Sequence, residues 1–138
     1  MINEKITLYN GVKVPVLGLG TWMIDDDKVK DIKLNFCKGC LAYQKNKCVI
    51  DDDVNSLLDT ILNSDTLVFA TPVYYYGMAG QLKTFLDRLN ALYSRKNKFK
   101  EVYLLATCAD VDKNALDKTI TFLSWWIECF EGVELKKS

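Results

Sequence analysis

Apolar residues recur at helical spacing in three stretches of the chain. The first, residues 54–62, has them at positions i, i+3, i+4, i+7 and i+8, and either Asp52 or Asp53 can cap its start. The second stretch covers residues 82–92, and the third covers 116–130 and ends near a glycine. The pattern predicts three helices that each bury one face.

Short, continuous apolar runs alternate with these helices. Residues 66–70 and 102–106 are β-prone without polar alternation, which is typical of parallel strands covered on both faces. Residues 133–135 begin a further strand, and the break at 63–65 separates the first helix from the first strand. Because alternating strands and helices need right-handed crossovers, the sequence predicts a layered α/β sheet.

Length and charge narrow the class of protein. The chain has 138 residues, enough for one domain, and its 18 Lys and Arg balance 18 Asp and Glu. This balance argues against nucleic acid and anionic membranes as partners. We find no apolar run of membrane-spanning length and no signal peptide, so we expect a cytoplasmic protein.

The absence of histidine restricts the chemistry further. Without His, the chain has no Ser-His-Asp or Cys-His nucleophile and no His-based zinc site. Five cysteines, an odd number, suit thiol or metal chemistry better than a disulfide framework. Chemistry is therefore expected from a cofactor, from cysteines or from carboxylates.

Two loops follow predicted strands and are expected at the same edge of the sheet. Ligands of such sheets bind beyond the carboxyl ends of the strands, which singles out residues 71–77 and 107–110. A planar aromatic ligand suits the tyrosines of the first loop, although tyrosines also simply cover sheet edges. The first loop and the residue after it are Thr71, Pro72, Val73, Tyr74, Tyr75, Tyr76, Gly77 and Met78.

The sequence around the first loop adds a family resemblance. ATPVYYYGM at residues 70–78, followed by QLK at 81–83 and FLDR at 85–88, resembles the NADPH-dependent FMN reductases and the iron–sulfur flavoproteins. The similarity extends upstream through the cysteine-containing residues 37–52 and downstream through TCAD at 107–110. It covers roughly three quarters of the chain, so the match is specific.

The resemblance implies a fold, a cofactor and a site. Residues 31–138 are expected to form a flavodoxin-like three-layer parallel sheet, incomplete at both ends. FMN is expected to bind with its ring against the 71–78 loop and against Cys108, Ala109 and Asp110, with NAD(P)H as electron donor. Lys83, Asp87 and Arg88 also match family positions, but their helical spacing favours a surface ion pair.

The cysteines resemble part of an iron–sulfur motif. Cys37, Cys40 and Cys48 match three ligands of the compact four-cysteine motif of iron–sulfur flavoproteins, whereas Tyr43 stands at the remaining position. We therefore expect no complete cluster within one chain, and a cysteine-rich loop near the flavin or at a subunit contact instead. Cys108 is either redox-active or a small apolar filler, and Cys129 is expected in or near the core.

Residues 1–30 resemble a different family. The stretch 6–22 is similar to the opening of aldo/keto reductases, with Asn10-Gly11 as a hairpin turn signal. A barrel of ~250 residues cannot fit into this chain, so an aldo/keto reductase activity is not expected.

This N-terminal segment stands where FMN reductases carry their phosphate-binding loop. We find no such loop, which leaves two hypotheses: an FMN-binding NAD(P)H-dependent oxidoreductase, or a non-catalytic flavodoxin-like module without the phosphate cradle. Residues 14–21 are predicted to supply a missing strand of the sheet. The lack of a covering helix then predicts a homo-oligomer, most simply a homodimer.

Overall fold

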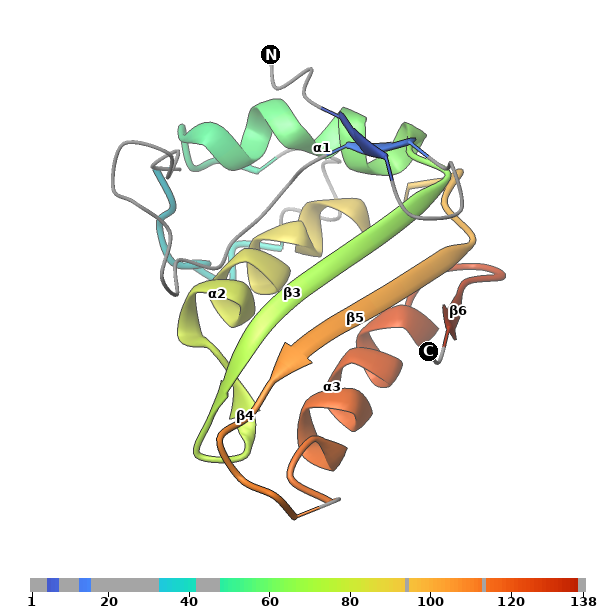
Figure 1. Cartoon of the computed structure of the whole chain (residues 1–138). Helices are drawn as coiled ribbons and strands as arrows, with labels where there is room; N and C mark the ends of the chain where they lie inside the picture. Colours follow the sequence, from blue (N-terminus) through green and yellow to red (C-terminus); the bar gives the residue numbers. More distant parts are fainter. Residues whose placement is uncertain are drawn as a thin grey trace.

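The computed structural model describes residues 33–41, 48–93, 95–112 and 114–136, together with the backbone of 5–7 and 13–15 (Figure 1). Strands β1 (Lys5–Thr7) and β2 (Lys13–Pro15) pair antiparallel, with Ile6 opposite Val14. This confirms the expected N-terminal β-hairpin, although Asn10-Gly11 lies outside the described residues.

The hairpin is a sheet of its own. Val14 and Pro15 pair with β1 and with no strand of the main sheet. The prediction that residues 14–21 supply a strand of that sheet is therefore wrong for these two positions, because they belong to a separate two-stranded sheet. Residues 16–21 lie outside the described part of the chain.

The main sheet has four strands in the order β4-β3-β5-β6. Strands β3, β5 and β6 are parallel, whereas β4 turns back antiparallel against the end of β3. Leu67 lies opposite Val102 and Pro72 opposite Thr107, so β3 and β5 end side by side (Figure 1). The strands are β3 (Thr66–Tyr74), β4 (Gly77–Met78), β5 (Glu101–Thr107) and β6 (Glu134–Lys136).

The three predicted helices are present. They are α1 (Asp53–Asn63), α2 (Gly80–Arg88), which a 3₁₀ turn η3 (Leu89–Leu92) extends, and α3 (Asp117–Glu128). Asp52 is the N-cap of α1, and its Oδ1 accepts a hydrogen bond from the Val54 amide at 3.2 Å. Within the described ranges, no helix combines the length and the apolar character needed to cross a membrane.

All three helices pack against one face of the sheet. The chain moves from β3 to β5 to β6 in one direction, so right-handed crossovers place α2 and α3 on the same side. Leu67, Phe69 and Thr71 are the buried positions of β3, and the Phe69 ring meets the Trp126 ring of α3 with centroids 5.6 Å apart. Helix α1 joins the same core beside η3.

The opposite face of the sheet is more open. Val68 and Ala70 of β3 and Tyr103 of β5 point there and are only partly buried, and Leu105 is 59% exposed. The predicted parallel α/β sheet is thus confirmed. The described helices form one layer on it, and a second helical layer, as in a three-layer fold, is not among the elements that the structure describes.

Candidate functional site

The expected loop at 71–77 is for the most part a hairpin. Strand β3 continues to Tyr74, where the sequence predicted its end at residue 70, and it pairs with β4 through Val73–Met78 and Tyr74–Gly77. Only Tyr75 and Tyr76 form the turn. The loop prediction was wrong in form because two tyrosines carry none of the usual turn signals, which are Asn, Asp and Gly.

This turn is strained. Tyr75 has a φ of 50° and Tyr76 a φ of 63°, the left-handed conformation that a two-residue type I′ turn requires at both positions. For a residue with a bulky side chain this conformation costs roughly 1–2 kcal/mol. Two adjacent strained tyrosines at a strand end are an observed outlier of the kind that concentrates at ligand sites.

The hairpin is linked to the second predicted loop. Tyr76 Oη donates a hydrogen bond to Asp110 Oδ2 at 3.1 Å, across 34 residues of sequence. Asp110 Oδ1 in turn accepts from the Asp112 amide at 2.9 Å. The two segments that sequence reasoning selected therefore lie together at the carboxyl ends of β3 and β5.

The link also shifts the proton equilibria of both groups. The hydrogen bond to the Asp110 carboxylate, and the negative charge of that carboxylate, raise the pKa of the Tyr76 phenol. The Asp112 amide and then the Tyr76 hydroxyl lower the pKa of Asp110. At neutral pH, therefore, Tyr76 holds its proton and Asp110 carries a negative charge. Lys118 Nζ lies 5.4 Å from the centroid of the Tyr76 ring.

The base of the hairpin is anchored to helix α2. Thr71 is buried, and its Oγ1 accepts from the Ala79 amide at 3.0 Å and donates to the Pro72 carbonyl at 2.8 Å. Ala79 is the N-cap residue of α2, so the helix starts at a position set by β3. Thr71 is thus turned inward and is not available to a ligand.

The remaining predicted site residues differ in exposure. Tyr74, Tyr75 and Tyr76 are exposed. A Cβ built on Gly77 meets only the Tyr74 carbonyl oxygen, at 3.7 Å, so the protein itself leaves space there. Partly buried positions are Pro72, Val73, Gly77, Met78 and Cys108, whereas Ala109 and Asp110 are exposed.

These residues fit a planar ring better than they fit a phosphate group. Exposed tyrosines at two adjoining strand ends offer flat apolar faces with polar tips. By contrast, α1 and α3 begin with Asp53 and Asp117, whose charge repels a phosphate, and the Ala79 amide at the start of α2 is already bonded to Thr71. No phosphate cradle is thus found in the ranges that the structure describes.

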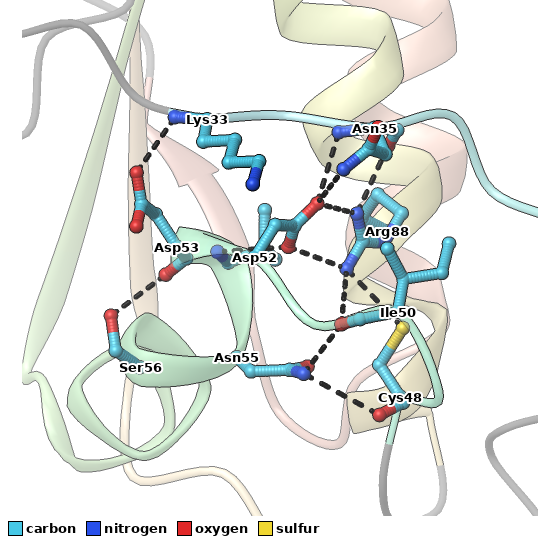
Figure 2. Close-up of polar contacts among 10 residues, drawn as sticks. Lys33, Asn35, Cys48, Ile50, Asp52, Asp53, Asn55, Ser56 and Arg88 are labelled. Atoms are coloured by element: carbon cyan, nitrogen blue, oxygen red, sulfur yellow. Dashed lines mark hydrogen bonds and ion pairs between the residues drawn. The ribbon is translucent and has the colours of Figure 1, made fainter.

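A second polar constellation, not anticipated from the sequence, surrounds Arg88 (Figure 2). Arg88 is 1% exposed, and its guanidinium forks onto the Asp52 carboxylate, with Nη2 2.8 Å from Oδ1 and Nη1 bonded to Oδ2. The predicted ion pair between Lys83 and Asp87 is confirmed at 2.6 Å on the surface. Arg88 does not join that pair, because five residues along a helix turn it about 140° away from Lys83.

Arg88 and Asp52 connect helix α2 with the segment around Asn35 and with the segment from Cys48 to Asp52, which precedes α1. Arg88 Nη1 donates to the Asn35 carbonyl at 3.0 Å, and Nη2 lies 3.3 Å from Cys48 Sγ and 3.5 Å from the Ile50 carbonyl oxygen. Asp52 Oδ2 accepts from the Asn35 amide at 2.9 Å. The hydrogen bond from Arg88 holds the pKa of Asp52 well below its usual range, and Asp52 raises the pKa of Arg88.

The cysteines are dispersed in the described structure. Cys37 and Cys40 are exposed, while Cys48 is buried and faces Arg88. No group of three metal-ligating side chains occurs within the described ranges, and Tyr43 lies outside them. Cys129 is exposed, so its predicted place in or near the core is wrong: it lies four residues after Trp125, which is exposed, and so on the outer face of α3, whereas Ile127 and Phe130 of the apolar stripe are buried.

The fold and the paired strand ends define a flavodoxin-like α/β protein whose candidate site, with its exposed tyrosines, lies at the carboxyl edge of the parallel strands. The sequence profile of the NADPH-dependent FMN reductase family matches residues 8–129. The chain belongs to this family. The match begins within the segment that resembles aldo/keto reductases, so a domain boundary at residue 30 stays a prediction.

Individual relatives agree with the family. The chain is 41% identical over 58 residues to an iron-sulfur flavoprotein of Archaeoglobus fulgidus, covering 41% of this chain and 26% of that one. It is 33% identical over 72 residues to YwqN of Bacillus subtilis, named as an NAD(P)H-dependent FMN-containing oxidoreductase, covering 46% and 40%. These matches span a quarter to two fifths of the relatives' length.

One solved structure is also similar. The Trp repressor binding protein from Bacillus subtilis superposes with a TM-score of 0.48 and 26% sequence identity, covering 64% of this chain and 60% of that one.

Proposed function

We propose that this protein is an NAD(P)H-dependent oxidoreductase that binds FMN. The observation that carries the proposal is the hydrogen-bonded junction of the Tyr75–Tyr76 hairpin with the loop at Asp110, at the ends of two parallel strands. A relative of this chain is named as an FMN-containing oxidoreductase, which supports FMN as the ligand. Ligands of doubly wound sheets bind at this edge.

The protein's own residues bind and orient the ring. FMN, when bound, supplies the hydride and electron chemistry. The faces of Tyr74 and Tyr75 exclude water from the ring, and the open space at Gly77 lets it approach the backbone. Tyr76 keeps its proton on Oη because the Asp110 carboxylate accepts a hydrogen bond from that hydroxyl. The phenol therefore stays neutral beside the ring.

The other predicted residues have supporting roles in this proposal. Met78 packs against the core, Pro72 and Val73 are partly buried in β3, and Thr71 sets the start of α2. Cys108 and Ala109 border the ring from the loop after β5. We further propose that the protein is cytoplasmic. We also propose that it is a homodimer, because a second copy would cover the apolar sheet face that contains the exposed Leu105.

A second candidate function is a flavodoxin-like module that does not retain FMN. The observation that favours it is the lack of a phosphate cradle within the described ranges. The two candidates differ in one measurable quantity, the affinity for FMN compared with that for riboflavin, which has the same ring without the phosphate. Similar affinities for the two ligands indicate binding through the ring alone, as the second candidate predicts, whereas a clear preference for FMN indicates that the phosphate is also bound.

Quenching of flavin fluorescence by the purified protein tests the proposal. Tyr74→Ala is expected to weaken FMN binding about 2- to 12-fold, the range of one aromatic contact. Phe36→Ala is the matched control, since Phe36 is an exposed aromatic residue outside the hairpin and the 107–110 loop. No quenching at high protein concentration, or equal losses in both variants, would overturn the proposal.

A further inference from the structure

The hairpin tip needs an external anchor. Tyr75 and Tyr76 both hold a left-handed backbone, and β4 contributes only two paired residues to the hairpin. A strand pair this short does not by itself enforce a strained turn. Among the described contacts, the hydrogen bond that reaches the turn from outside the hairpin comes from Tyr76 Oη to Asp110.

Asp110 is itself held in place. Its Oδ1 accepts from the Asp112 amide at 2.9 Å, and Asp112 Oδ1 accepts from the Asn114 amide at 2.9 Å. These two side-chain turns lead into α3, whose Lys118 lies over the Tyr76 ring. The hairpin tip is therefore tied, through one carboxylate, to the loop that precedes α3.

We propose that Asp110 is a positioning residue for flavin binding, which holds Tyr76 and so keeps the Tyr75–Tyr76 turn in the conformation that presents its rings to the ligand. This inference rests on the proposed function and deepens it. The role needs a carboxylate, because Asp110 must accept two hydrogen bonds on different oxygens. An asparagine would place its Nδ2, a donor, where one of the two carboxylate oxygens now accepts, and an alanine accepts neither hydrogen bond.

A double-mutant cycle on FMN affinity tests this inference. Asp110→Ala and Tyr76→Phe are each expected to raise the Kd for FMN roughly 2- to 10-fold. The double variant should bind no more weakly than the weaker single variant, because both changes remove the same hydrogen bond. Glu128→Gln, which neutralises an exposed carboxylate on the far end of α3, should leave the Kd unchanged.

A second measurement does not need the flavin. In the FMN-free protein, the ¹³Cζ resonance of Tyr76 reports its titration, and Asp110→Asn should lower that pKa toward the ordinary tyrosine range and shift the Tyr75 and Tyr76 amide resonances. Wild-type protein that binds no FMN would defeat the proposed function, while the titration still tests the anchor. Unchanged Tyr76 titration and unchanged amide resonances, or additive losses in the cycle, would overturn the inference.

Discussion

Replacing Arg88 by methionine should destabilise the protein strongly. Among the residues that the structure describes, Arg88 is the largest fully buried side chain, and methionine has a similar length but no charge. The change leaves the Asp52 carboxylate buried, with the Asn35 and Val54 amides as its remaining backbone donors. Removing one partner of a buried ion pair costs about 3–5 kcal/mol. We expect the lower end of this range, since these donors still stabilise the carboxylate.

The effect of this substitution should depend on pH. Because the pKa of Asp52 is lowered in the folded protein, its contribution to stability is present above the ordinary carboxyl pKa of about 3.9 and is lost as the pH falls toward the folded pKa. Arg88→Met removes most of this contribution. The difference in unfolding free energy between wild type and variant should therefore be full at pH 7 and shrink below about pH 4.

Urea unfolding followed by far-UV circular dichroism measures this difference. Lys83→Met on the same helix is the matched control, since it breaks an exposed ion pair and should cost less than about 1 kcal/mol. Asp52→Asn keeps the helix cap and separates the loss of the charge from the loss of the cap. If Arg88→Met proves too unstable to purify, Arg88→Lys keeps the charge without the fork. Equal costs for Arg88→Met and Lys83→Met would refute the reasoning.

Three further outcomes are expected. Tyr75→Asn should raise the unfolding free energy by up to roughly 1 kcal/mol, because asparagine tolerates the left-handed backbone, and should weaken FMN binding; a urea midpoint below that of wild type would contradict the strain. Anaerobically purified protein should contain less than stoichiometric iron and acid-labile sulfide, and full stoichiometry would show that a thiolate other than Cys37, Cys40 and Cys48 completes a cluster. Light scattering should give the mass of a dimer, against which a strict monomer at micromolar concentration would count.

Local patterns were sufficient for most of the fold. Helical spacing placed α1, α2 and α3 within a few residues, and the position before an apolar stripe narrowed the cap of α1 to Asp52 or Asp53, of which the structure has Asp52. The continuous apolar runs marked the parallel strands. What local pattern missed was the extension of β3 to Tyr74, because pairing with β4, and no turn residue, defines that strand end.

The buried ion pair could not be predicted in the same way. Arg88 and Asp52 are 36 residues apart, and each has an ordinary local explanation, as a surface charge and as a helix cap. The spacing places Arg88 three residues after Phe85 and four before Leu92, beside the apolar stripe, but it does not show that the guanidinium meets Asp52 and Cys48 there. Such a pair becomes visible only when the packing of α2 against the segment before α1 is known.

The site and the ion pair are connected through helix α2. The amide of its N-cap residue, Ala79, is bonded to Thr71 in β3, and its last residue, Arg88, is locked to Asp52. The hairpin that presents the tyrosines runs directly into this helix, so its base is held at one end of an element that is fixed at both ends. Its tip is held separately, by Asp110 in the loop between β5 and α3. A motif in the sequence therefore identifies the residues at the site, whereas contacts over more than 30 residues of chain determine how they are held.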